Sequence, residues 1–370
     1  MWRGSSDPRP PALLVALLYA AFLIPLIHAR DNDVSRFVVA GGPGVDAHAV
    51  PPGLTVRSDI AGYDGTMFYR LALNPFTREE TAYGIKLDNP AYRQQRIGYP
   101  LLTWLITFGR PRLIPWALLI INHMGVIAIA WLGDVLAAHF GAHAAWGVLF
   151  AMYPGFLMTI SRDLSEIVAC AFILAAALAF LKERPYLGAT LLTFAILTRE
   201  TAVIVAIALL LRRKWIASVP LAIYAVWQAA LALQWGVTPL KGRSPHFTLP
   251  FSEFAAFFAD AAPRRIYMQR LHFAECILLA LVVIAVVLIW RRTTIALEWR
   301  LAWLGFLALF ATLPHDVWTE DFGFLRILGD FFVVSALLIV SSTSTATRWI
   351  VLLASAGVWQ HLARHIIDLR

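Results

Sequence analysis

The residues best suited to chemistry are concentrated in one polar and aromatic segment, residues 57–100. Asp64 precedes a helix-like stretch in which Arg70 follows about two turns later, a position where Asp64 could also be the helix N-cap. Arg93 and Arg96 lie about one turn apart. A carboxylate can accept the proton of an attacking hydroxyl, and guanidinium groups bind phosphate oxygens in a bidentate manner. The pattern predicts a site for a phosphate-bearing substrate with Asp64 as the base. The alternative is that these arginines are solvated or contact anionic lipid.

Further ionisable residues lie between apolar segments. Asp163 and Glu166 have the spacing of a capping box, a structural role, or they contact an acceptor substrate. Arg199 and Glu200 separate two short apolar runs, where charges are costly and often functional, or they form a local ion pair. A later acidic and aromatic segment is suited to sugar binding by stacking and hydrogen bonding; its residues are Asp316, Trp318, Glu320, Asp321, Phe322 and Arg326.

The sequence predicts no metal site and no disulfide. His139 and His143 have the i, i+4 spacing of metal ligands, but Gly141 interrupts the helix and no carboxylate accompanies them. The two cysteines, Cys170 and Cys276, lie inside apolar runs and are interpreted as packing residues. Because no Walker A motif is present, we expect the energy for any reaction to come with the substrate.

The composition is typical of a membrane protein. Hydrophobic residues make up 59% of the chain and charged residues 15%, and the mean hydropathy is +0.68. A water-soluble globule could not accommodate these values without large exposed apolar patches. The net charge is +8, but the basic residues cluster at the ends of apolar runs and so indicate membrane topology. We therefore expect membrane lipid, and no nucleic acid, as a partner.

Apolar runs and flanking charges predict an all-α polytopic protein with about ten or eleven transmembrane helices. Residues 11–29 follow Arg3 and Arg9 and lack a convincing cleavage site, which indicates an uncleaved signal anchor with a cytoplasmic N-terminus. The positive-inside rule places three basic groups in the cytoplasm: Lys182 with Arg184, Arg212 to Lys214, and Arg291 with Arg292. The later spans are expected at 113–138, 145–159, 166–181, 187–197, 201–211, 216–235, 274–290, 299–313 and 327–340. The run 349–359 either spans or lies in the interface, which leaves the side of the C-terminus open.

We expect one integral-membrane domain over residues 1–370. It comprises the first helix at 11–29, an external catalytic loop at 30–112 and the remaining bundle at 113–370. Within the loop, residues 97–108 are fewer than the ~17–25 of a span, so they are predicted to form a juxtamembrane helix in the outer interface. A short tilted span is the alternative.

The chain resembles the GT-C glycosyltransferases, multi-spanning enzymes that take a sugar from a polyprenyl-phosphate carrier at the outer membrane face. The resemblance covers roughly residues 10–240. It rests on the uncleaved first helix, the large first loop, the Asp64-Gly-x-x-x-Tyr69-Arg70 run, Gly98-Tyr99-Pro100 before the juxtamembrane helix, and the elements at 161–166 and 197–200. The Asp-Asp or Asp-Glu pair of the family is replaced by Asp64-Gly65, which argues against a metal-assisted mechanism.

The resemblance implies a transferase that moves a sugar, with mannose favoured, from a polyprenyl-phosphate donor to a cell-envelope glycan or glycolipid. Asp64 is expected to be the base of an inverting displacement without a divalent metal. The expected substrate-binding residues are Tyr69, Arg70, Arg93, Arg96, Tyr99, Asp163, Glu166 and Arg199. The expected location is the bacterial plasma membrane, with the active site facing outward. The alternatives are a transporter or flippase for a lipid-linked or anionic solute, which usually shows paired halves absent here, and a non-catalytic scaffold.

Overall fold

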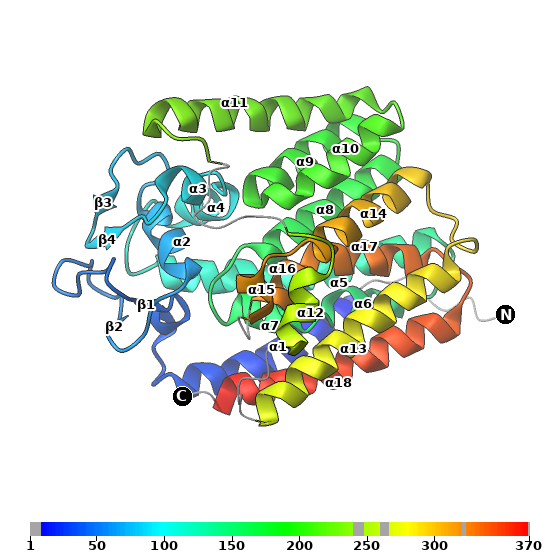
Figure 1. Ribbon diagram of the computed structural model, residues 1–370, viewed down its shortest axis with the longest axis horizontal. Coiled ribbons are helices and arrows are strands. Elements are labelled where there is room, and N and C mark those ends of the chain that lie inside the picture. Colours follow the sequence, from blue (N-terminus) through cyan, green and yellow to red (C-terminus); the bar gives the residue numbers. More distant parts are fainter. Residues whose placement is uncertain (1–8, 240–247, 260–265, 320–322, 369–370) are drawn as a thin grey trace.

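A computed structural model describes residues 9–239, 248–259, 266–319 and 323–368, and the regular structure in them is mostly helical (Figure 1). Most of the longer helices run along one direction of the molecule, and the elements of the first loop gather at one end of them. We refer to this as the loop end and to the opposite end, where α1 begins, as the far end. The arrangement agrees with the expected helical fold class.

Five helices in the described part of the chain are long and apolar enough to cross a membrane, which indicates a multi-pass membrane protein. They are α1 (Arg9–Ala29), α5 (Ile114–His139), α11 (Ser218–Trp235) with the turn η4 (Trp215–Ala217) before it, α13 (Ile266–Ile289) and α18 (Thr345–Asp368).

Shorter apolar helices pack among these five: α8 (Glu166–Leu181), α9 (Pro185–Thr198), α10 (Val203–Leu211) preceded by η3 (Glu200–Ala202), and α17 (Gly329–Val340). Each is shorter than the ~17–25 residues of an ordinary span. The total of ten or eleven spans therefore stays a prediction.

The other helical elements outside the first loop are short, except for α14 (Leu297–Ala311). They are η2 (Ala144–Gly147), α6 (Val148–Ala151), α7 (Gly155–Ile160), α12 (Ser252–Ala259), α15 (His315–Thr319) and α16 (Phe324–Ile327). The single helix predicted at 145–159 is divided between η2, α6 and α7. Pro154 causes the main break, because it lacks an N–H and disfavours helical geometry at Tyr153.

The first loop folds into its own small assembly at the loop end. It contains η1 (Val34–Phe37), a parallel pair of β1 (Ala40–Gly41) with β2 (Val56–Arg57), α2 (Asp64–Leu73), an antiparallel pair of β3 (Thr81–Ala82) with β4 (Ile85–Lys86), α3 (Pro90–Gln94) and α4 (Gly98–Thr107). Phe68 and Tyr99 make an edge-to-face contact at 5.5 Å between ring centroids, and they join α2 to α4 in a buried apolar cluster. This cluster fixes the start of α2 against the helix bundle.

The juxtamembrane segment forms α4, which has ten residues. At 1.5 Å per residue it is about 15 Å long, half the thickness of the hydrocarbon core. The placement of this segment in the outer interface stays a prediction, with a short tilted span as the alternative.

The basic turns and the first loop lie at opposite ends of the molecule. Figure 1 shows the turns α10–α11 and α13–α14 at the far end. α8 begins beside the first loop at Glu166, and α9 ends there at Thr198, so the turn that joins them also lies at the far end. Ile366, in the last turn of α18, lines a pocket together with Arg57 of the first loop. The C-terminal end of α18 is therefore at the loop end, a side that the sequence left open.

Candidate functional site

Asp64 is the first residue of α2, where the positive end of the helix dipole favours a carboxylate. The prediction that it is the N-cap is wrong by one residue: Tyr63 occupies that position, and no side chain caps the helix. Gly65 explains how α2 reaches this place. A Cβ at residue 65 would collide with the carbonyl oxygen of Arg162 and lie 2.7 Å from that of Val38. The Asp-Gly sequence thus allows the start of α2 to pack directly against two backbone segments.

Two arginines from different parts of the chain bind the Asp64 carboxylate. Arg93 of α3 donates from Nη1 to Oδ1 at 2.7 Å, and Arg326 of α16 donates from Nη1 to Oδ2 at 3.3 Å. Arg93 also donates to Asp88, at 2.7 Å from Nε and 2.9 Å from Nη2. The contact with Arg326 joins the first loop to a helix 262 residues later.

The charged contacts continue from Arg326 into the helix bundle. Its Nη1 lies 3.2 Å from Oε1 of Glu166, and the same oxygen lies 2.6 Å from Nη1 of Arg199. The Nε of Arg199 is 3.8 Å from Oδ2 of Asp330 in α17. The side chains of Glu166, Arg199 and Asp330 are at most 4% exposed, so each of these charges depends on its partners for stabilisation.

A second ion pair lies beside this network. Arg96 donates to both carboxylate oxygens of Glu200, at 2.7 Å from Nε and at shorter range from Nη2, and Nη2 also donates to the hydroxyl of Tyr92 at 2.8 Å. Gly98 makes this approach possible, because a Cβ there would lie 2.9 Å from the backbone nitrogen of Thr198 and even closer to its hydroxyl. Arg199 and Glu200 thus each form an ion pair with another residue: Glu200 with Arg96, and Arg199 with Glu166. The interpretation that they pair with each other is wrong.

These residues surround a pocket of about 280 Å³, which we call the carboxylate pocket. The charged and polar residues of its lining are Asp64, Glu166, Glu200, Arg96, Arg199 and Arg326, together with Tyr92, Gln95 and Thr201. The apolar residues of its lining are Pro239, Leu309, Leu313, Pro314, Val317 and Ile327. The charged groups of the lining are three carboxylates and three guanidinium groups, so their formal charges balance.

The environment keeps Asp64 ionised. Burial on its own would raise the pKa of this carboxyl group, but Arg93, Arg326 and Arg96 outweigh burial and hold the pKa well below its usual range. While the arginines bind it, the Asp64 carboxylate is a weak base. Its basicity rises only when a competing anion draws the arginines away.

The structure brings five of the predicted residues together at this site, namely Asp64, Arg93, Arg96, Glu166 and Arg199. Three others lie elsewhere, in the packing of the first loop. Tyr69 is fully buried in the apolar cluster, and Arg70 donates to Thr77 Oγ1 at 3.0 Å. The hydroxyl of Tyr99 donates to the carbonyl oxygen of Leu118 at 2.9 Å and accepts from Asn122 at 2.8 Å. In this geometry none of the three lines the carboxylate pocket.

Asp163 does not form the capping box that its spacing indicated. It adopts left-handed backbone geometry with φ of 51°, and α8 starts at Glu166 with Ser165 as an N-cap that makes no side-chain bond. Its carboxyl group is fully buried near Arg30. Burial raises the pKa of Asp163 well above its usual range, and Arg30 opposes that shift.

Two contributors were absent from the sequence-based set of site residues. Arg326 was assigned to the acidic and aromatic segment, but its contact is with Asp64. Asp330 was passed over, although a lone Asp inside an apolar run is a recognisable signal of a buried polar contact. In the same segment Trp318 is buried against Phe324 at 5.5 Å, so its ring is not open for sugar stacking. Glu320, Asp321 and Phe322 lie outside the described residues.

The described residues contain no group of three His, Cys, Asp or Glu side chains placed to hold a metal ion. His143 has a local role, because its Nδ1 accepts a hydrogen bond from the backbone N–H of Ala145 at 3.2 Å. The metal independence of the expected reaction stays a prediction.

Comparison with protein-family models, with curated proteins and with solved structures finds no match. The site must therefore be interpreted from its own geometry.

Proposed function

We propose that the protein is a GT-C-like glycosyltransferase that moves a sugar from a polyprenyl-phosphate donor to a cell-envelope glycan or glycolipid. The observation that carries the proposal is the pairing of Asp64 with Arg93 and Arg326 at a pocket whose lining combines charged and apolar side chains. A lipid-linked phosphate sugar presents the same combination of an anion, a polar ring and an apolar chain.

In this proposal the arginines change partners when the donor binds. Arg326, Arg199 and Arg96 turn from carboxylates to the phosphate, because a phosphate offers several oxygens to each guanidinium group. Asp64 then loses Arg326 and Arg96 and keeps its contact with Arg93, so its pKa rises. The Asp64 carboxylate removes the proton of the acceptor hydroxyl as that oxygen attacks the anomeric carbon. The bond from this carbon to the phosphate oxygen breaks, and the arginines stabilise the departing lipid phosphate. One displacement inverts the anomeric centre.

The pocket supports a lipid donor on physical grounds. Leu309 lies in the last turn of α14, Leu313 lies just after this helix, and Val317 lies in α15. They offer apolar surface to the first isoprenoid units, and each buried CH₂ group contributes about 0.8 kcal/mol to binding. The charged residues of the lining would hold the phosphate and sugar. Tyr69, Arg70, Tyr99 and Asp163 would then support the first loop and would not contact substrate.

Topology supports an outward-facing site. The basic turns lie at the far end, and lysine and arginine in short loops favour the cytoplasm. The carboxylate pocket at the loop end would then face outward in a bacterial plasma membrane. Ten or eleven spans and mannose as the sugar are part of this proposal.

The decisive experiment uses purified protein with a polyprenyl-phosphate sugar and measures release of the lipid phosphate. We expect Asp64→Asn to lower the rate by about 100- to 10,000-fold, the usual contribution of a general base. Asp46→Asn is the matched control, because Asp46 is an exposed aspartate in the same loop. Its carboxylate accepts a hydrogen bond from the His48 N–H at 3.0 Å.

An Asp64→Asn variant that folds and retains full transfer would refute the proposal. Solute flux through liposomes that survives Asp64→Asn would favour the transporter alternative.

A further inference from the structure

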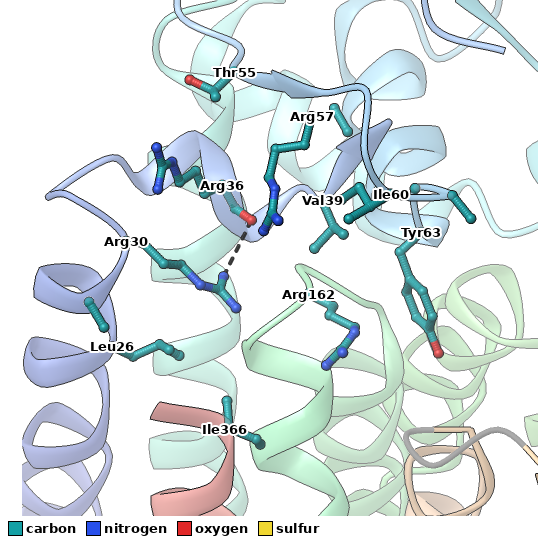
Figure 2. A pocket seen from close by; sticks show the side chains of 14 residues that line it. Leu26, Arg30, Arg36, Val39, Thr55, Arg57, Ile60, Tyr63, Arg162 and Ile366 are labelled. Carbon is teal, nitrogen blue, oxygen red and sulfur yellow. Dashed lines mark hydrogen bonds between the residues drawn. The ribbon is translucent and has the colours of Figure 1, made fainter. Parts of the chain in front are cut away.

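A second pocket of about 390 Å³, which we call the arginine pocket, has Tyr63 in its lining (Figure 2). Four of its lining residues are arginines, namely Arg30, Arg36, Arg57 and Arg162, and none of its described lining residues is acidic. Its lining thus differs in charge from that of the carboxylate pocket.

The arginines come from separate parts of the fold. Arg30 follows α1, Arg57 lies on β2, and Arg162 lies in the turn before α8. In Figure 2 the side chains of Arg30 and Arg57 extend into the space between these elements, and Arg162 extends beside them towards Tyr63. Three cationic side chains that approach one another from different elements are costly unless an anion binds among them.

The nearby carboxylates leave this positive charge only partly compensated. Arg36 pairs with Asp31 at 2.6 Å, and Arg57 pairs with Asp59 at 2.8 Å. Asp59 is 66% exposed and Arg57 is 44% exposed, and exposed pairs of this kind contribute little stability. An incoming anion can therefore replace Asp59 at Arg57 at small cost.

Arg30 is held in place without a paired surface carboxylate. It donates from Nη1 to the carbonyl oxygen of Ser161 at 3.0 Å, and its guanidinium lies 4.2 Å from the centroid of the Phe37 ring. Burial is the main cause that lowers the pKa of Arg30, the charge of Arg162 adds to the shift and the buried Asp163 opposes it, so that the pKa is about 10. The part that comes from Arg162 is the effect expected where positive charges lie close together.

The remaining wall of the pocket is apolar and belongs to two of the five long helices. Leu26 and Ala29 lie in the last turn of α1, and Ile366 lies in the last turn of α18. If α1 and α18 cross the bilayer, this wall is at headgroup depth, next to the hydrocarbon boundary. A lipid with a small anionic headgroup fits this pocket, with the headgroup at the arginines and the chain at the apolar residues.

We infer that the arginine pocket binds the phosphate monoester headgroup of a membrane lipid, with the start of the lipid chain against Leu26 and Ile366. The inference concerns binding and holds whether or not Asp64 catalyses transfer.

Isothermal titration calorimetry in a neutral maltoside detergent tests the inference with two probes, inorganic phosphate and dodecyl phosphate. We expect dodecyl phosphate to bind at least about tenfold more tightly, because its chain adds apolar contact. The double variant Arg57→Gln with Arg162→Gln should weaken this binding by about tenfold or more, since each removes a charge-assisted hydrogen-bond donor. Arg57→Gln alone, at an exposed position, should give a smaller loss in the same direction and is the variant least able to disturb folding.

Two controls separate this site from the rest of the surface. Arg78→Gln changes an exposed arginine of the same loop outside both pockets and should leave dodecyl phosphate binding unchanged. Arg93→Gln changes the charge at Asp64 of the carboxylate pocket, so it reports on any separate binding event there and should leave the event that depends on Arg57 and Arg162 unchanged. Loss of binding in Arg93→Gln with retention in the Arg57/Arg162 variant would overturn the inference, because the phosphate would then occupy the carboxylate pocket. Equal affinity for the two probes would overturn the lipid source.

Discussion

The carboxylate pocket and the arginine pocket differ in the charge of their linings. In the first, Asp64, Glu166 and Glu200 are matched by an equal number of arginines. In the second, four arginines line the pocket with apolar and neutral residues, and the carboxylates that pair with Arg36 and Arg57 lie outside the lining. A balanced set of buried charges can exchange partners during a reaction, whereas an unbalanced set is prepared to bind an anion. The same residue type, arginine, thus has a different role in each pocket.

The largest expected difference between the pockets concerns stability. Arg199→Met should lower the free energy of unfolding by about 3–5 kcal/mol, because it leaves the buried carboxylate of Asp330 without Arg199 and leaves Glu166 with Arg326 alone. Arg57→Met, in the arginine pocket, should change it little, because the Arg57 pair is exposed. Denaturant titration in detergent measures both.

The double variant Arg199→Met with Asp330→Asn should recover part of the loss, since it removes the carboxylate that has lost its cation. Equal effects of Arg199→Met and Arg57→Met would remove the contrast between balanced and unbalanced pockets.

A second prediction concerns the backbone contact that places Asp64. Gly65→Ala should cost about 1–3 kcal/mol, because the added methyl group meets the backbone of Val38 and Arg162 and must displace it. Gly357→Ala in α18 is the matched control, since a Cβ there has no neighbour within 4 Å, and it should be neutral or slightly stabilising. Thermal unfolding compares the two, and a Gly65→Ala protein as stable as the wild type would contradict the proposed close approach.

A third prediction uses pH to compare the pockets. The pKa of Asp64 is depressed in the folded protein, so its ionised form contributes stability at every pH above its ordinary value of 3.8, and the contribution is lost as the pH falls from there towards the folded pKa. The difference in unfolding free energy between wild type and Asp64→Asn should therefore be constant from about pH 8 to 5 and shrink near about pH 3.

Arg57→Gln supplies the comparison for this pH series. Its difference from wild type should not change between about pH 8 and 5, because neither Arg57 nor its partner Asp59 titrates in that range. A difference for Asp64→Asn that disappears already at about pH 5 would mean that the arginines do not hold the Asp64 carboxylate as described.

The smallest effect is expected at the rim of the arginine pocket. Asp59→Asn removes the exposed carboxylate that competes for Arg57, so dodecyl phosphate should bind more tightly by about two- to fivefold. Asp46→Asn, an exposed aspartate away from the pocket, is the control and should have no effect. Weaker binding in Asp59→Asn would show that Asp59 positions Arg57 and does not compete with the ligand.

The sequence predicted the helices well where apolar runs end at clear signals. The helix predicted at 166–181 has the bounds of α8, and the one at 113–138 differs from α5 by one residue at each end. The prediction failed at 145–159, where the apolar pattern continued through Pro154 although the backbone could not. It also stopped short in α18, whose last turns contain polar residues beyond the apolar run at 349–359.

The candidate site was predicted only in part, because ion pairs between distant segments have no local signature. The importance of Asp64, Arg93 and Arg96 followed from the density of charge in one loop. Arg326 contacts Asp64 across 262 residues of sequence, and Glu200 pairs with Arg96 across 104 residues. Both contacts depend on how distant segments pack together. Asp163 shows the converse error, since a capping-box spacing was present without the backbone geometry that a cap needs.

The Tyr63 ring, which lines the arginine pocket, lies 5.1 Å from the guanidinium of Arg162 and 5.0 Å from that of Arg326, which lines the carboxylate pocket. Through these two contacts Tyr63 links the two pockets, so a ligand in one pocket affects the electrostatics of the other. A dianion seated beside Arg162 makes the electrostatic potential around Arg326 more negative and favours the protonated state of Asp64. Replacing the Tyr63 ring by an aliphatic side chain would remove both cation–π contacts and so change how ligand binding in one pocket affects ligand binding in the other.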